Sequence, residues 1–154
     1  MVATTMERTT RMITNIHREV TYPHARAKVW RGLTDPTLMA KWIMKPEGFA
    51  PVVGTRFKMF AAGPQRGWRG WVACEVLVAD EPDVLSYSWV GDDRHLPLTC
   101  TFRLSDDGPS GTRLVLDHTG FEGIGGFLLA KLMMGPGWSK MLKQRLLAAV
   151  GRGE

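Results

Sequence analysis

The stretch GPGWSKMLKQRLLAAV, residues 135–150, decides the fold, because it is the large helix that the rest of the sequence has to be packed against. Pro136 suits the start of a helix, where its missing N–H is not needed. At a repeat of 3.6 residues one side of the helix is apolar. That side consists of Trp138, Met141, Leu142, Leu146 and Ala149. A helix with such a side needs a second layer to bury it.

Strand patterns supply that layer. ITNIHREVTYPH, residues 13–24, predicts a first strand that Pro23 ends. Five more strand-like runs follow, and the segments between them carry the Gly, Pro and Asp typical of turns between antiparallel neighbours. The runs are 52–62, 67–80, 83–90, 96–105 and 111–119. The sequence therefore predicts an antiparallel sheet of about six strands.

Two short helices are predicted between the first strand and the rest of the sheet, over residues 25–44. Asp35 suits the N-cap of the second helix, and Pro36 its first position. Pro36 also disfavours helical geometry at Asp35, so the first helix has to end there. The fold class is α+β, with the sheet covered by the terminal helix.

Residues 120–137 begin with glycines and continue with a short apolar stretch. They predict a small helix or a flap, with residues 121–134 as a lid over the core or, as the alternative, an interfacial membrane contact. The stretch is too short and too interrupted by charge to span a bilayer.

Length and composition favour one domain over residues 11–154, preceded by a flexible tail at residues 1–10. The net charge of +5 is scattered rather than clustered, so nucleic acid is not an expected partner. Cys74 and Cys100 lie in strand patterns, and the first residues do not form a secretory leader. We expect free thiols and a cytoplasmic protein.

Motifs for cofactors and metals do not emerge from the sequence. The four histidines have no metal-ligand spacing, and the two cysteines lie too far apart for a CxxC site. A GxSxG nucleophile motif is missing, and GFEGIGG, residues 120–126, lacks the spacing of a phosphate loop. We expect no cofactor and no protein-bound metal.

Five stretches, in this order and spacing, resemble a known family. They are YPHARAKVWRGLTDPTLMAKW (22–42), VGTRFKM (53–59), CEVLVADEPDVLSYSW (74–89), LTCTFRLSDDGPSGTRLVLDHTGFEG (98–123) and GPGWSKMLKQRL (135–146). They are similar to the activator of heat-shock-protein-90 ATPase homologues, within the START-like, birch-pollen-allergen-like superfamily called SRPBCC. The resemblance implies a helix-grip fold, in which a curved sheet wraps a long C-terminal helix and often encloses a hydrophobic cavity.

The resemblance does not select one activity, because the same fold serves many. Co-chaperones of the family carry an extra N-terminal domain, whereas this chain reaches its first predicted strand almost at once. A chaperone is therefore the less expected partner, and a small hydrophobic molecule the more expected one. The protein is expected to be a monomer or a homodimer.

His118 is the first candidate for a functional side chain, because it shares a strand face with Leu114 and Leu116. It is interpreted as a cavity-lining or structural residue, as a ligand contact or as a catalyst. Asp117 points to the opposite face and cannot orient it. No catalytic residue is assigned.

Arg145 is the second candidate, because a repeat of 3.6 residues places it within the apolar side of the terminal helix. Its side chain either extends to solvent or reaches into the cavity. Glu75 is a possible acidic partner, although a solvent-facing position is the first expectation for it. Together with His118 these residues form a possible polar cluster.

The predicted lining of the cavity is mostly aromatic and aliphatic. It comprises Trp42, Phe57, Met59, Tyr87, Trp89, Phe102, Leu116, His118, Phe121, Trp138, Met141, Leu142 and Arg145. Three functions remain open: a domain that binds a small hydrophobic molecule, a protein-interaction module with a filled core, and a cyclase- or hydrolase-type enzyme that uses His118.

Overall fold

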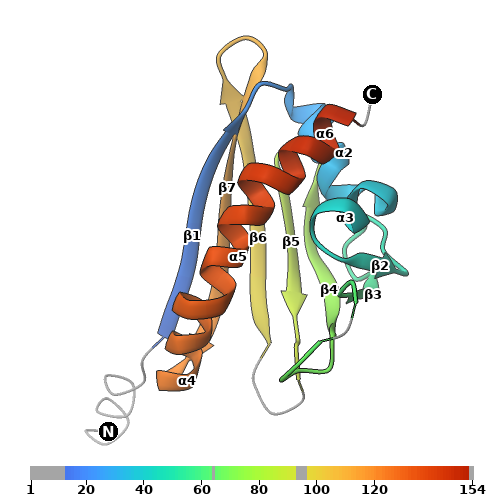
Figure 1. The fold of residues 1–154 in the computed structure, drawn as a ribbon. Coiled ribbons are helices and arrows are strands. Elements are labelled where there is room, and N and C mark those ends of the chain that lie inside the picture. The colour runs from blue at the N-terminus through green and yellow to red at the C-terminus, as the bar shows by residue number, and fades with distance from the viewer. Residues whose placement is uncertain (1–12, 64, 93–96, 153–154) are drawn as a thin grey trace, which may run out of the picture.

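A computed structural model of the chain describes residues 13–63, 65–92 and 97–152 (Figure 1). The predicted tail, residues 1–10, lies outside the described residues. In chain order the strands are β1 (Ile13–Tyr22), β2 (Lys45–Glu47), β3 (Arg56–Phe60), β4 (Trp71–Asp80), β5 (Val84–Trp89), β6 (Leu98–Asp107) and β7 (Gly111–Glu122). Helices α2 (Arg26–Thr34) and α3 (Pro36–Trp42) follow β1. This is the α+β arrangement that the sequence predicts.

The strands form one antiparallel sheet in the order β1-β7-β6-β5-β4-β3-β2. The first strand thus pairs with the last one, and the other neighbours follow one another along the chain. The described residues form seven strands rather than about six, because the three-residue β2 pairs with β3 at the edge. Its sequence, KPE, contains Pro46 and is too short to show an alternation.

The break between α2 and α3 has the predicted cause. Asp35 has an extended backbone, with φ −81° and ψ 118°, and its carboxylate accepts a hydrogen bond from the Thr37 amide at 2.8 Å. Pro36 occupies the first helical position. Two residues are therefore enough to end one helix and begin the next.

The terminal helix begins earlier than predicted, at Gly123. Its successive segments are α4 (Gly123–Leu128), the π-helical η1 (Leu129–Met134), α5 (Gly135–Lys140), the π-helical η2 (Met141–Leu146) and α6 (Leu147–Arg152). The residues that join the segments have helical backbone angles, so the helix is continuous across Pro136. A proline inside a helix removes one hydrogen bond and crowds the preceding turn. The wider π turn of η1, directly before it, absorbs this irregularity.

The predicted apolar side of the terminal helix is buried: Trp138, Leu142, Leu146 and Ala149 lie in the core, and Met141 is half-buried against it. Ala130 and Val150 are buried as well, and together with Trp138, Leu142 and Leu146 they have a spacing of four residues or its multiple. In a regular α-helix each step of four residues would turn the buried side by about 40°. A π turn contains more residues than an α turn, and this cancels the drift. The helix therefore keeps most of its buried side chains on one line along the sheet.

Figure 1 shows the terminal helix crossing one face of the sheet, with α4 near the start of β1 and α6 next to α2. The core lies between the helix and this face. Cys74 and Cys100 are buried there as free thiols. No helix in the described part of the chain is long and apolar enough to cross a membrane.

Candidate functional site

His118 lies in the middle of β7, paired with Ile16 of β1 on one side and Cys100 of β6 on the other. Its side chain points to the face of the sheet that the terminal helix covers, and the residue is fully buried. Of the buried residues in the described chain, only Ser86, Thr112 and His118 are polar. The imidazole is thus a rare polar group in an apolar interior.

The indole of Trp138, on α5, fixes the protonation of this imidazole. Trp138 Nε1 lies 2.9 Å from His118 Nδ1, and an indole N–H can only donate. Nδ1 must therefore be the unprotonated, accepting nitrogen, and a neutral ring carries its proton on Nε2. Nε2 is buried and has no hydrogen-bond partner among the described residues. The site presents an unused N–H donor.

Aromatic rings enclose the imidazole. The ring centroids of Trp89 and Phe121 each lie 5.0 Å from that of His118, and the centroid of Trp138 lies at 5.6 Å. Burial among these rings lowers the pKa of His118 from its ordinary 6.5 to about 3, because the charged form is poorly solvated there. At neutral pH the ring is uncharged and is a weak base, so the geometry disfavours a general-base role.

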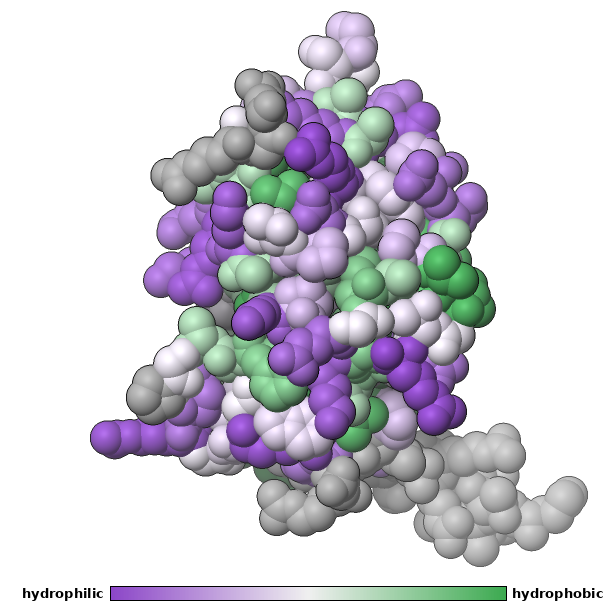
Figure 2. Space-filling view, turned by 90° about the vertical axis from the view of Figure 1, so that its right-hand side faces the viewer, coloured by the Kyte–Doolittle hydropathy of each residue, from purple (hydrophilic) through white to green (hydrophobic). Residues whose placement is uncertain are grey.

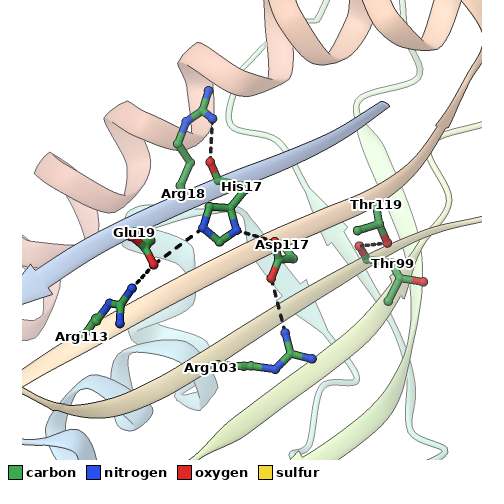
Figure 3. A network of polar contacts seen from close by, with 8 residues as sticks. All are labelled: His17, Arg18, Glu19, Thr99, Arg103, Arg113, Asp117 and Thr119. Atoms are coloured by element: carbon green, nitrogen blue, oxygen red, sulfur yellow. Dashed lines mark hydrogen bonds and ion pairs between the residues drawn. The ribbon is translucent and has the colours of Figure 1, made fainter. Parts of the chain in front are cut away.

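Asp117 is on the opposite face, as the strand alternation predicts. It belongs to an exposed network on β1, β6 and β7 (Figure 3), in which its carboxylate lies 2.7 Å from His17 Nδ1 and 3.4 Å from Arg103 Nη1. His17 also lies 3.7 Å from Glu19, which pairs with Arg113. Exposed ion pairs of this kind contribute little stability, and none of these groups reaches His118.

The aromatic and aliphatic residues proposed for the lining lie in one core. Trp42, Phe57, Met59, Tyr87, Trp89, Phe102, Leu116, Phe121, Trp138 and Leu142 are buried, and Met141 is half-buried against them. Their rings are in contact across the interior, with centroid distances of 5.3 Å for Phe57–Tyr87, 6.0 Å for Tyr87–Phe102 and 5.9 Å for Phe102–Trp138. A ligand contact by these residues stays a prediction.

The possible polar cluster of Glu75, His118 and Arg145 does not form. Glu75 alternates with the buried Cys74 and Val76, so it points away from the core, where its carboxylate lies 3.3 Å from Arg56 Nε. Arg145 is exposed. Its exposure agrees with the alternative in which its side chain extends to solvent.

Two buried groups on the terminal helix were missed by the sequence reasoning. The first is the Trp138 indole as the partner of His118, twenty residues away. The second is the Leu142 carbonyl, which accepts a hydrogen bond from the Tyr22 hydroxyl at 2.7 Å. Both join the terminal helix to the sheet. No spacing or motif in the sequence signals either pair.

Comparison with known proteins agrees with the fold. The model of the family described as Activator of Hsp90 ATPase homolog 1-like protein matches residues 23–151. The chain belongs to this family. No curated protein matches the chain.

Solved structures that are similar to this chain include three proteins from bacteria. Protein MLL2253 from Mesorhizobium loti is 29% identical, with a TM-score of 0.75, over 92% of this chain and 99% of that one. Protein BH1534 from Bacillus halodurans is 23% identical, with a TM-score of 0.71, over 92% and 99%. The Aha1 dimer from Colwellia psychrerythraea is 19% identical, with a TM-score of 0.70, over 92% and 98%. The last two likenesses show the fold alone.

Metal chemistry finds no support in the described residues. They contain no group of three or more His, Cys, Asp or Glu side chains that could hold a metal ion. The chemistry that this site offers is the donation of one hydrogen bond in apolar surroundings.

Proposed function

We propose that this protein binds a small, uncharged hydrophobic molecule between the sheet and the terminal helix, and that an oxygen acceptor of the molecule takes the N–H of His118 Nε2. The observation that carries the proposal is this buried donor, which has no partner among the described residues. A buried donor without an acceptor costs about 1–3 kcal/mol, so a matching acceptor is favoured there.

The surroundings define the class of molecule. The described residues bury no charged side chain, and a charged ligand without a counter-charge would be strongly disfavoured. Aromatic rings on three sides favour a flat or aliphatic skeleton. Lipids and polyketide-like molecules with a ketone, ether or hydroxyl oxygen fit these conditions.

Affinity would come mainly from apolar area, at roughly 25 cal/mol for each Å² removed from water. The hydrogen bond would supply orientation and selectivity. Because the aromatic rings are in contact with one another, a ligand has to part them. Slow or temperature-dependent binding is therefore expected.

Native mass spectrometry and thermal unfolding against a panel of neutral lipids and aromatic ketones test the proposal. A ketone ligand should bind the wild type about tenfold more tightly than the His118→Phe variant, a difference that corresponds to about 1.4 kcal/mol. The deoxy analogue of the same ligand should not distinguish the two proteins. Asp117→Asn, on the opposite face, is the control and should bind like the wild type.

Two outcomes would count against the proposal. The first is a panel in which no compound binds or raises the unfolding temperature. The second is equal affinity of the wild type and His118→Phe for every ketone that does bind.

An interaction function is supported by a separate observation, the exposed apolar side chains on α4 and η1. The dimer described for the Colwellia relative agrees with a homodimer here, but at this identity the state of this chain stays a prediction.

A further inference from the structure

An apolar surface lies on the outer side of the first half of the terminal helix. Its most exposed members are Ile124, Leu132 and Met133, with 74%, 70% and 66% of their surface accessible. Phe127, Leu128 and Leu129 complete it. We call these six residues the helix patch. They occupy α4 and η1, next to the start of β1 (Figure 1).

The helix patch contributes no buried residue to the core. Within η1 the buried residue is Ala130, and α4 buries none. Gly126 allows α4 to approach the end of β7 closely, because a Cβ on it would lie 2.7 Å from the Phe121 backbone. Large apolar side chains gathered on one exposed helix mark a contact with something else.

Other parts of the surface differ from the helix patch. On the side where α3, β2 and β3 lie, hydrophobic and hydrophilic residues are interspersed (Figure 2). Scattered exposed apolar residues of that kind are normal in soluble proteins. The helix patch stands out because its six members lie within ten residues of two adjoining helical segments.

Charge indicates what covers the helix patch. Residues 123–152 include five Lys or Arg and no Asp or Glu. Lys131 is exposed within the patch, and Lys140, Lys143 and Arg145 are exposed farther along the helix. Lys140 continues the four-residue spacing of Ile124, Leu128 and Leu132, so apolar and basic residues share the outer side. Such a surface is complementary to an anionic one.

We propose that the terminal helix lies on an anionic lipid membrane, with the helix patch inserted at the level of the headgroups and the basic residues against the phosphates. Apolar side chains with Lys131 among them and Lys140 along the same outer side are what interfacial helices use. The lysine stems reach past the apolar side chains to the headgroups. The inference does not depend on the ligand proposed above.

A second copy of the chain fits this surface less well. A two-fold contact places the same patch of each copy against the other, so Lys131 of each copy would approach a basic helix. Within residues 123–152 neither copy supplies an acidic side chain, and the single Glu122 at the N-cap of α4 does not balance five basic residues, so like charges across the interface are unfavourable. Phospholipid headgroups provide the missing negative charge.

Vesicle sedimentation with the full chain tests the inference. The vesicles are phosphatidylcholine alone or phosphatidylcholine with about one-third phosphatidylserine. The wild type should partition about tenfold more strongly onto the anionic vesicles, and added salt should weaken this binding. Lys131→Gln combined with Lys140→Gln should remove most of the preference for phosphatidylserine.

Variants of the patch separate lipid insertion from charge alone. Leu132→Gln should reduce binding to anionic vesicles about tenfold. Val53→Gln is the matched control, because Val53 is similarly exposed, at 62%, but lies in a turn away from the helix; it should bind like the wild type. Circular dichroism checks that each variant is folded, and Ile124→Gln replaces Leu132→Gln if that variant is not.

Three results would overturn the inference. One is an absence of sedimentation with both kinds of vesicle. Another is binding that Leu132→Gln and Ile124→Gln leave unchanged. The third is a concentration-dependent dimer, seen by analytical ultracentrifugation, that Leu132→Gln dissociates, because this would assign the helix patch to a second copy.

Discussion

The Trp138 indole nitrogen lies 2.9 Å from Nδ1 of His118, and this hydrogen bond joins the terminal helix to the centre of β7. Both residues are fully buried. Because the indole can only donate, the bond also decides which nitrogen of the imidazole carries the proton. One contact thus holds two elements together and leaves a free donor at Nε2.

Replacing Trp138 with Phe should lower the free energy of unfolding by about 1–3 kcal/mol more than Trp89→Phe does. Both changes shrink a ring beside the imidazole, but Trp89 meets His118 only by a ring contact. The additional loss of stability in Trp138→Phe therefore measures the lost hydrogen bond to His118. Urea unfolding at neutral pH measures it, and equal losses for the two variants would refute the assignment.

Stability should fall when the pH drops below about 6.5, the ordinary pKa of histidine. Burial lowers the pKa of His118 to about 3 in the folded protein, so between these values only the unfolded chain takes up this proton. This contribution of His118 to the free energy of unfolding is present above pH 6.5 and is lost as the pH falls toward 3.

Comparison with His118→Gln isolates this effect, because Gln keeps a polar group and does not titrate. From about pH 7 to about pH 5 the wild type should lose about 2 kcal/mol more than the variant. Guanidinium unfolding at both pH values gives the difference. Parallel pH dependences for the two proteins would show that His118 is not the responsible group.

Asp35→Ala should destabilise the protein by about 1 kcal/mol, because the Thr37 amide loses its side-chain acceptor. Asp35→Asn keeps an acceptor oxygen and should cost much less. The Arg31–Asp35 pair, at 3.9 Å and exposed, contributes little. If Asn and Ala were equally destabilising, the charge and not the cap would be the cause.

Gly32 and Val150 should be energetically coupled. A Cβ on Gly32 would lie 2.8 Å from Val150 Cγ2 and 3.0 Å from Leu146 Cδ1, where α2 packs on the terminal helix. Gly32→Ala should therefore be about 1 kcal/mol more favourable in a Val150→Ala background than in the wild type. Thermal unfolding of the four proteins in this double-mutant cycle measures the coupling, and additive effects would contradict the close approach.

Much of the fold could be predicted because its signals are local. Polar and apolar residues alternate in residues 111–119, which lie in β7, and this pattern can be seen from neighbouring residues alone. Asp35 and Pro36 decide the helix break by their own backbone preferences. β2 was not predicted, because a strand of three residues that contains Pro46 is too short to show an alternation of polar and apolar side chains. The start of the terminal helix was misplaced because Pro136 is a valid first residue and gives no sign of the π turn before it.

The candidate site was only partly predictable. Strand alternation was sufficient to separate His118 from Asp117 and to allow that Glu75 points outward. It could not pair His118 with Trp138, because the pair depends on where the helix lies along the sheet. The repeat of 3.6 residues left open whether the Arg145 side chain extends to solvent or reaches into the core, and only the tertiary structure shows it exposed.

The sequence by itself determined the strands other than β2, the turns between them, the helix break and the basic, acid-free character of residues 123–152. These properties follow from backbone preferences and composition, which neighbours along the chain decide. The tertiary structure decided the orientation of Arg145, the protonation of His118 and the exposure of the helix patch. Each of these depends on how the terminal helix is rotated against the sheet, and that rotation results from packing between residues far apart in the chain.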